Sequence, residues 1–438
     1  MGSPRPLTVL FLVVFFFSSQ ALAADIRRRE KRHWVDIWAT MPQLTEPANL
    51  PPAPYNQTGV VFADATLRQT IQVSLSASIL RLQISNVFGI SDLPITAATL
   101  ALPLNGSAGT SAIEYHTLKP LTFSRSPNYT IPSGALVVSD PIDFPVKSQS
   151  ILTISLYLAE GQTTNSITSH PGSRTTSYFA PGNQVNAPEL GDTEGVLSAD
   201  HWYFISTLQS YLPSTNPSTS SLAIIGDSIT DGRGSTTNGN NRWSDVLLSR
   251  LQKNPGTQGI TVLNLAAGGN RVLYDGLGPN ALSRLDRDVL SHPNIGYVLI
   301  YEGVNDIGTA SVDVAAQHNV GTRLIAAYDQ MITRLHSSGI PVFGATITPF
   351  SGPGQTYTDP ERERTRQRVN GWIRRNGRFD GVVDFDAVVR NKTQVDQLME
   401  VYNSGDYLHL NPEGYRAMGD AVDLALFERF ADGVDEIL

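Results

Sequence analysis

The pattern of hydrophobic residues changes at a short polar segment, residues 213–220. Before this segment, hydrophobic side chains recur at every second position in several runs, most clearly over 151–158, and this period is typical of half-buried β-strands. After it, short hydrophobic runs alternate with amphipathic stretches such as 323–337. This alternation is typical of a parallel sheet covered by helices on both faces. The change, in a chain of 438 residues, predicts two domains.

We therefore expect an all-β sandwich resembling a jelly roll over 33–212, a linker over 213–220 and an α/β domain over 221–438. The strands expected in the second domain are 222–225, 262–265, 297–301, 341–347 and 382–385. The helices expected there are 243–251, 323–337, 362–375 and 412–430. In such folds the active site lies at the carboxyl ends of the strands.

The first residues predict a secreted, extracellular protein. Arg5 precedes a hydrophobic run over 7–17, and the small residues around Ala23 suit cleavage by signal peptidase. The run is shorter than the roughly 20 residues of a membrane-spanning helix, so residues 1–23 are interpreted as a signal peptide rather than an anchor. Residues 24–32 end in Lys31-Arg32, which fits a short propeptide or a solvated charged tail. N-glycans are expected at the surface, at the sequons of Asn56, Asn105, Asn128 and Asn391.

Composition argues against several classes of function. The chain has no cysteine, which rules out a disulfide, a thiolate nucleophile and a cysteine-based zinc site. Its formal net charge of −8 disfavours nucleic-acid binding, which needs a basic face. The histidines and carboxylates form no cluster at metal-ligand spacing, so neither a metal nor a cofactor is expected.

A serine stands directly after the first expected strand of the α/β domain, in Gly226-Asp227-Ser228-Ile229-Thr230. A serine in this turn exposes its hydroxyl at the edge of the sheet, where a base can activate it. The same serine can equally be a simple helix cap. No Gly-x-Ser-x-Gly elbow occurs in the chain, which disfavours an α/β-hydrolase.

Three further segments carry groups that suit a serine nucleophile. Asp406 and His409 are separated by about one helical turn, so both can face one pocket, where the acid would orient the base; a surface acid and a capping histidine are the alternative. Gly269 and Asn305 each follow an expected parallel strand. The Gly269 N–H and the Asn305 amide can join the Ser228 N–H in binding an oxyanion, although glycine turns after strands are common.

Together the segments GDSIT, NLAAGGN, GVND and DYLHLNPEGY resemble the four blocks of the SGNH, or GDSL-type, hydrolase superfamily, in the same order. The resemblance implies a flavodoxin-like α/β fold. It also implies that Ser228 is the nucleophile and an oxyanion donor, that Gly269 and Asn305 are the other donors, and that Asp406 and His409 complete a triad. Ile229 replaces the leucine of the family name, and Gly268 is the alternative to Gly269, which is preferred because it precedes Asn270.

The likeness extends to the first half of the chain. Segments 34–40, 67–69 and 84–89 resemble secreted members with an N-terminal β-domain, some of which are carbohydrate esterases such as xylan acetylesterases. Several single residues have two interpretations each. For Arg68 and Asn86 a structural role in the β-domain is favoured over a place near the site, and for Asp227 a loop-fixing hydrogen bond is favoured over a role as a second acid. Trp243 and Tyr274 can line the acyl or sugar pocket, with core packing favoured for Trp243.

The resulting hypothesis is a secreted serine esterase that removes acetyl groups from a polysaccharide through an acyl-enzyme. A lipase or general short-chain carboxylesterase is one alternative, although no amphipathic lid is evident. A glycan-binding protein with a vestigial site is another, and the intact set of four blocks argues against it. The expected partner is the ester substrate, with no nucleic acid and no membrane span.

Overall fold

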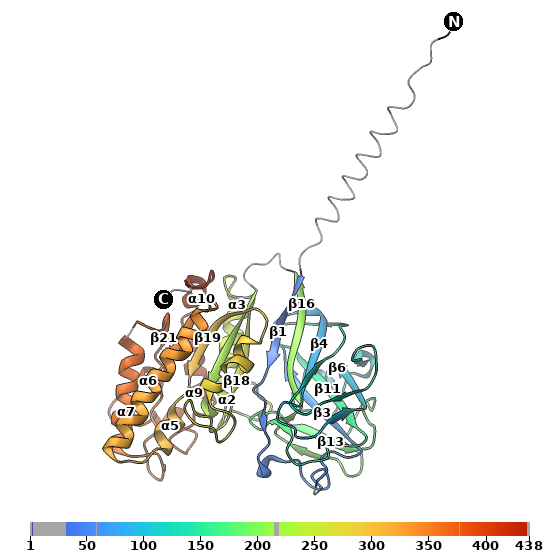
Figure 1. Cartoon of the computed structure of the whole chain (residues 1–438), viewed down its shortest axis with the longest axis horizontal. Helices are drawn as coiled ribbons and strands as arrows, with labels where there is room; N and C mark the ends of the chain where they lie inside the picture. Colours follow the sequence, from blue (N-terminus) through green and yellow to red (C-terminus); the bar gives the residue numbers. More distant parts are fainter. Residues whose placement is uncertain (1, 3–31, 58, 214–218, 376, 436–438) are drawn as a thin grey trace.

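The computed structural model describes residue 2 and residues 32–57, 59–213, 219–375 and 377–435. The predicted signal peptide apart from residue 2, the predicted propeptide apart from residue 32, and most of the predicted linker fall outside these residues. Two units stand side by side, a β-sandwich that contains β1 to β16 and an α/β domain that begins at β17 (Figure 1). Among the helices that the structure describes, none combines the length and the apolar character needed to cross a bilayer.

The sandwich consists of two antiparallel sheets that enclose a hydrophobic core. One sheet contains β1 (Arg32–Ala39), β16 (Ile205–Pro213), β4 (Ala77–Ser85) and β10 (Ile142–Val146), with β9 (Leu136–Val138) paired to β4. The other contains β14 (Leu197–Ala199), β13 (Ser177–Pro181), β3 (Ala65–Gln72), β11 (Ile151–Leu158), β6 (Ala97–Ala101) and β7 (Lys119–Pro120). The all-β sandwich expected from the period-two pattern is therefore confirmed.

Two smaller sheets complete this unit. One pairs β5 (Leu93–Ile95) with β8 (Tyr129–Ile131). The other, in the order β15 (Trp202–Tyr203), β12 (Thr168–His170) and β2 (Gln43–Leu44), lies on the side that faces the α/β domain. The ends of this three-stranded sheet and the loops beside them line the same cleft as Ser228.

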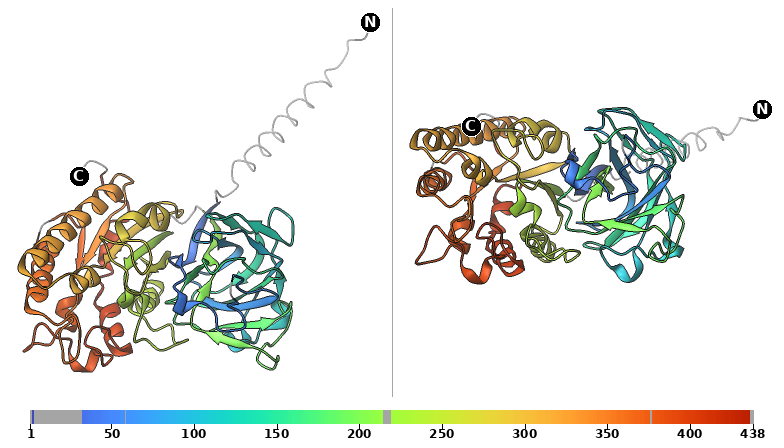
Figure 2. Two further views of the ribbon diagram at one scale, coloured as in Figure 1. Left: turned by 60° about the horizontal axis from the view of Figure 1, so that its bottom comes forward. Right: turned by 90° about the horizontal axis from the view of Figure 1, so that it is seen from below.

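The α/β domain is built on a parallel sheet in the order β18 (Ile260–Ala266), β17 (Ser220–Gly226), β19 (Ile295–Tyr301), β20 (Val342–Ala345) and β21 (Gly381–Val383). Numbered within the domain, this order is 2-1-3-4-5, the flavodoxin-like arrangement, and its switch point lies between β17 and β19. Its helices are α2 (Ser228–Asp231), α3 (Trp243–Lys253), α4 (Ala281–Leu285), α5 (Val304–Thr309), α6 (Val314–His336), α7 (Pro360–Arg375), α8 (Phe385–Val389), α9 (Pro412–Ala421) and α10 (Ala425–Arg429). With α6 and α7 packed together on one face and α3 and α9 on the other, the expected fold class is confirmed (Figure 2).

Two expected helices differ from the structure. α6 begins nine residues before the expected 323, because Asp313 caps it by accepting a hydrogen bond from the Ala316 N–H at 2.8 Å. The expected helix 412–430 is two helices, since Val422 is extended and Asp423 begins a new turn by accepting from the Ala425 N–H. Arg250 donates to the carbonyl of Val422 at 2.8 Å and so satisfies a group that the break exposes.

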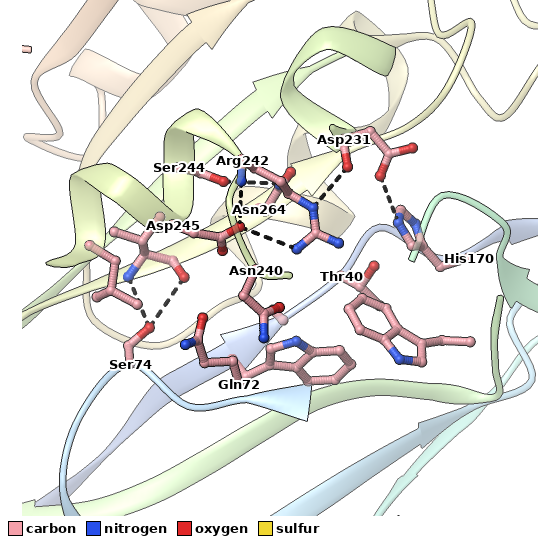
Figure 3. Close-up of a pocket in the computed structure, with 15 residues that line it drawn as sticks. Thr40, Gln72, Ser74, His170, Asp231, Asn240, Arg242, Ser244, Asp245 and Asn264 are labelled. Atoms are coloured by element: carbon pink, nitrogen blue, oxygen red, sulfur yellow. Dashed lines mark hydrogen bonds and ion pairs between the residues drawn. The ribbon is translucent and has the colours of Figure 1, made fainter. Parts of the chain in front are cut away.

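The two units are joined by buried polar contacts beside β1. β1 packs against β18, the edge strand of the parallel sheet. Asp36 on β1 has no exposed surface, and its carboxylate accepts from the Gln209 amide at 2.7 Å and pairs with His292 of the α/β domain at 2.5 Å. Ser74 exchanges hydrogen bonds with the backbone of Val262 on β18 (Figure 3). A buried polar group is stabilising only while its partners remain in place.

We expect Asp36→Ala to lower the free energy of unfolding by about 2 kcal/mol or more, because the buried Gln209 amide then lacks its acceptor. Thermal and urea unfolding of the full chain would measure the loss. Asp143→Ala on β10 is the matched control, since Asp143 is exposed. Equal unfolding midpoints for the two variants would contradict the stabilising role of this contact.

Candidate active site

Ser228 stands at the carboxyl end of β17, at the start of the single turn of α2. The Asp227 carboxylate caps this turn by accepting from the Ile229 N–H at 3.0 Å, as expected for a loop-fixing residue. Gly226 is required by close packing, since a Cβ there would lie 2.6 Å from the Thr230 hydroxyl oxygen. Gly232 ends the turn with φ of +99°, a left-handed conformation that favours glycine.

His409 lies against the serine. Its Nε2 is 2.7 Å from the Ser228 hydroxyl oxygen, and its Nδ1 is 2.6 Å from Oδ2 of Asp406. The other Asp406 oxygen accepts from the N–H groups of Leu408 and His409 at 3.0 and 2.8 Å. The expectation that acid and base lie about one helical turn apart is wrong in detail, because residues 403–409 form an irregular turn in which Tyr407 has φ of +58°. The two side chains still face one cleft.

Electrostatics keep this histidine available as a base. Burial lowers the pKa of His409, Asp406 opposes that shift, and the charges of Arg233 and Arg174 lower it further. Partial burial raises the pKa of Asp406, but hydrogen bonds from the His409 side chain and N–H outweigh it, and the net pKa is well below the ordinary value. A neutral imidazole oriented by an ionised carboxylate can take a proton from a hydroxyl.

Hydrogen-bond donors gather on the other side of the serine. Asn305, in the first turn of α5, uses one amide hydrogen for the carbonyl of Asn270 at 2.9 Å. Its amide oxygen accepts from the Tyr357 hydroxyl at 3.1 Å, which fixes the direction of the amide. Within the described chain the N–H groups of Ser228 and Gly269 make no hydrogen bond. These donors can bind an oxygen that becomes negatively charged.

The turn that contains Gly269 is held by the residue after Asn305. Asp306 accepts from the N–H groups of Val272 and Leu273 at 2.8 and 2.9 Å. Gly269 itself has φ of +73° and faces Leu277, whose methyl carbon would lie 2.4 Å from an added Cβ. The conformation and the space both require glycine at this position.

Buried carboxyl groups surround the nucleophile turn. Burial raises the pKa of Asp227 to about 7, with the nearby Asp306 and Asp231 adding to the effect. Burial raises the pKa of Glu302 to about 8 against the opposing charge of Arg284, and that of Asp306 to about 6 against its backbone hydrogen bonds. Burial thus disfavours the charged form of all three carboxyl groups.

A cleft of about 430 Å³ opens above Ser228 and His409. One wall belongs to the α/β domain, with Arg233, Leu277, Asn305 and Tyr357. The opposite wall belongs to the β-sandwich and contains Gln43, Glu46, Asn49, Pro171, Arg174 and His201. Sequence reasoning did not find this second wall, because its residues lie in short loops without a motif. The described residues contain no group of three or more histidine and carboxylate side chains that could hold a metal ion.

The remaining expectations divide between the core and the surface. Arg68 is buried and donates to the carbonyls of Ser111, Gln184 and Ala187, so its role is structural. Asn86 is likewise buried in hydrogen bonds of the β-sandwich and does not line the cleft. Trp243 is fully buried in the core of the α/β domain. The expectation that Tyr274 lines the pocket is wrong, since it is exposed and borders a separate hollow with Arg271 and Thr309.

Comparisons with known proteins find a family match in the second half of the chain. Residues 224–417 match the model of the GDSL-like lipase/acylhydrolase family. A comparison with curated proteins finds no match.

Solved structures resemble about half of the chain. A GDSL-like lipase from Bacteroides thetaiotaomicron is 17% identical, with 50% of this chain and 93% of that chain covered and a TM-score of 0.36. A carbohydrate acetylesterase family member from Sinorhizobium meliloti is 16% identical, with 48% and 97% covered and a TM-score of 0.36. An acetyl xylan esterase is 18% identical, with 46% and 96% covered and a TM-score of 0.34.

We expect a fluorophosphonate to label Ser228 at a rate that depends on neutral His409. Because burial lowers the pKa of this histidine below 6.5, the rate should be maximal near neutral pH and fall on acidification with a midpoint below pH 6.5. Mass spectrometry of the labelled protein between about pH 4 and about pH 8 would measure it.

Ser228→Ala should remain unlabelled, whereas Ser338→Ala, which changes an exposed serine after α6, should react like the wild type. Labelling of Ser228 at a rate that does not fall on acidification, or labelling elsewhere in the chain, would contradict the pairing of Ser228 with His409. A midpoint above pH 6.5 would show that Asp406 outweighs burial in setting the pKa of His409.

Proposed function

Because the chain carries a GDSL-like lipase/acylhydrolase domain over residues 224–417, we propose that it is a serine esterase in which Ser228, His409 and Asp406 form the catalytic triad. One observation carries the proposal: the unbroken chain of contacts from the Ser228 hydroxyl through His409 to Asp406, at 2.7 and 2.6 Å. A serine hydroxyl becomes nucleophilic when a positioned base accepts its proton. All three groups meet at the carboxyl ends of the parallel strands, beside the switch point of the sheet.

The proposed reaction is acyl transfer in two steps. His409 takes the Ser228 proton while the hydroxyl oxygen attacks the ester carbonyl, and the protonated imidazole then donates that proton to the departing alcohol. The N–H groups of Ser228 and Gly269 and the free amide hydrogen of Asn305 bind the oxyanion. Water, deprotonated by His409, then attacks the acyl-enzyme and releases the acid.

The substrate that we propose is an O-acetylated polysaccharide. The wall of the cleft formed by the β-sandwich is polar, with the Gln43 and Asn49 amides held by the Glu46 carboxylate at 2.5 and 3.0 Å. Leu277, Leu408 and Tyr357 are among the few apolar side chains in the lining. A polar cleft suits a hydroxyl-rich alcohol and a small acyl group better than a long acyl chain. Secretion, through residues 1–23, and N-glycans on the four sequons are part of the same proposal.

We expect wild type to release acetate from acetylated xylan or acetylated pectin, and Ser228→Ala to lose nearly all of this turnover, because no other group replaces the nucleophile. Acetate release and the hydrolysis of p-nitrophenyl esters of increasing chain length would measure it. Preference for long acyl chains, without activity on a polysaccharide, would favour a lipase. Glycan binding by wild type without any turnover dependent on Ser228 would favour a binding protein with a vestigial site.

Asn305→Ala, which removes the side-chain amide, should lower kcat by about 10²–10³-fold, because a transition-state hydrogen bond is lost. Tyr357→Phe should lower kcat by about 10-fold with a smaller change in KM, because the amide of Asn305 remains but loses the bond that orients it.

Tyr274→Phe is the matched control, since it removes a hydroxyl that does not line the cleft. If Tyr357→Phe and Tyr274→Phe had the same kcat as wild type, Tyr357 would not orient Asn305.

A further inference from the structure

Two arginines border the cleft from opposite units. Arg174 follows β12 in the β-sandwich, and Arg233 follows α2 in the α/β domain. Within the described chain neither guanidinium has a hydrogen bond or an ion pair to another residue. Arg233 is exposed, whereas Nε of Arg174 is buried without a partner. Arg284 and Arg366, which are buried elsewhere, each have several acceptors. An arginine that lacks acceptors beside a nucleophile suggests an acceptor supplied by the ligand.

The acidic groups of the cleft do not neutralise these charges. The carboxylate of Glu46 accepts from two side-chain amides, that of Asp231 pairs with His170 at 2.9 Å, and that of Asp406 pairs with His409. Both arginines lie close enough to His409 to lower its pKa through their charges. The open part of the cleft therefore presents two cations to a ligand that reaches Ser228.

The backbone at both arginines is fixed. Arg174 has φ of +51°, an uncommon conformation for a residue other than glycine, and its carbonyl accepts from the Asn238 N–H at 2.9 Å. The preceding carbonyl, of Ser173, accepts from Arg242. The Arg233 N–H donates to the carbonyl of Ser228 at 2.9 Å. Contacts from the α/β domain hold the backbone at Arg174, and a contact within the α/β domain holds the backbone at Arg233. Both backbone positions are therefore set before a ligand arrives, which lowers the entropic cost of binding.

A neutral histidine stands on the same wall as Arg174. His201 donates from Nδ1 to the carbonyl of Pro171 at 2.6 Å, since a carbonyl can only accept. Burial lowers the pKa of His201, which keeps the ring neutral. Its Nε2 is then an acceptor, the group that a sugar hydroxyl needs as a partner.

We propose that the acetyl group cleaved by this protein is carried by an acidic sugar, whose carboxylate binds Arg174 and Arg233 and whose hydroxyl donates to His201. This inference rests on the proposed esterase function and specifies its substrate class: an O-acetylated polysaccharide of uronic acid. Guanidinium groups bind carboxylates in a planar, charge-assisted geometry, which gives direction as well as affinity.

The test compares acetate release from acetylated polygalacturonate and from the same polymer after methyl esterification, which converts its charged carboxylates into neutral methyl esters. We expect wild type to have a kcat/KM at least about 10-fold higher on the charged polymer, and Arg174→Gln to reduce this ratio toward one. Arg174→Lys should restore part of the ratio, and added salt should lower it in wild type. Arg416→Gln, which changes an exposed arginine of α9 outside the cleft, is the charge-matched control.

A binding measurement separates this inference from the proposed function. Galacturonate oligomers should bind Ser228→Ala measurably in calorimetry, and the double variant with Arg174→Gln about 10-fold more weakly. Hydrolysis of both polymers at equal rates, with a ratio that Arg174→Gln does not alter, would overturn the charge inference and leave the esterase intact. Absence of all turnover dependent on Ser228 would overturn the proposed function, and the acidic-sugar substrate with it.

Discussion

The nucleophile turn is held in place by a contact between the two units of the fold. Asp231, the last residue of α2, places Oδ1 2.9 Å from Nε2 of His170, and both side chains are almost fully buried. The other ring nitrogen of His170 faces the carbonyl of Met41 at 3.0 Å. Because a carbonyl only accepts, Nδ1 carries a hydrogen. A buried contact between His170 and Asp231 therefore joins the β-sandwich to the turn that begins with Ser228.

The surroundings of this contact show how closely the units must fit. Gly172 approaches Asp231 so nearly that a Cβ would lie 1.6 Å from Oδ2, and the carbonyl of Asp231 accepts from Nε of Arg242 at 3.0 Å (Figure 3). Arg242 also donates to the carbonyl of Ser173, on the loop that leads to Arg174. A shift of this loop would move one wall of the cleft and loosen the nucleophile turn together. The β-sandwich thus helps to hold the turn that carries the proposed nucleophile.

Features that depend on residues close together in the sequence could be predicted, and features that depend on contacts between distant segments could not. Strands such as 222–225 were predictable because a buried parallel strand is a continuous hydrophobic run, and Ser228, Asn305 and His409 each lie in a segment with a local pattern. The break between α9 and α10 was not predictable from periodicity. There the carbonyl of Val422 accepts a hydrogen bond from Arg250, which lies far away in the sequence. The wall that contains Arg174 and His201 was missed for the same reason. Those side chains acquire a common direction only when β2, β12 and β15 pair, and pairing between segments far apart in sequence leaves no local pattern.

The residues proposed for catalysis and those proposed for substrate selectivity differ in the same way: the first are fixed by contacts that are local in the sequence, and the second by contacts between distant segments. The groups proposed to break the ester belong to one domain and are fixed by short turns, namely the cap at Asp227 and the irregular turn at Asp406. The groups proposed to bind the alcohol lie mostly on loops of the other unit. Substitutions on the wall formed by the β-sandwich can therefore change the preferred alcohol while the distance between Ser228 and His409 stays the same. That freedom has a limit at His170 and Gly172, where the wall and the nucleophile turn share the same contacts, and there selectivity and catalysis cannot vary independently.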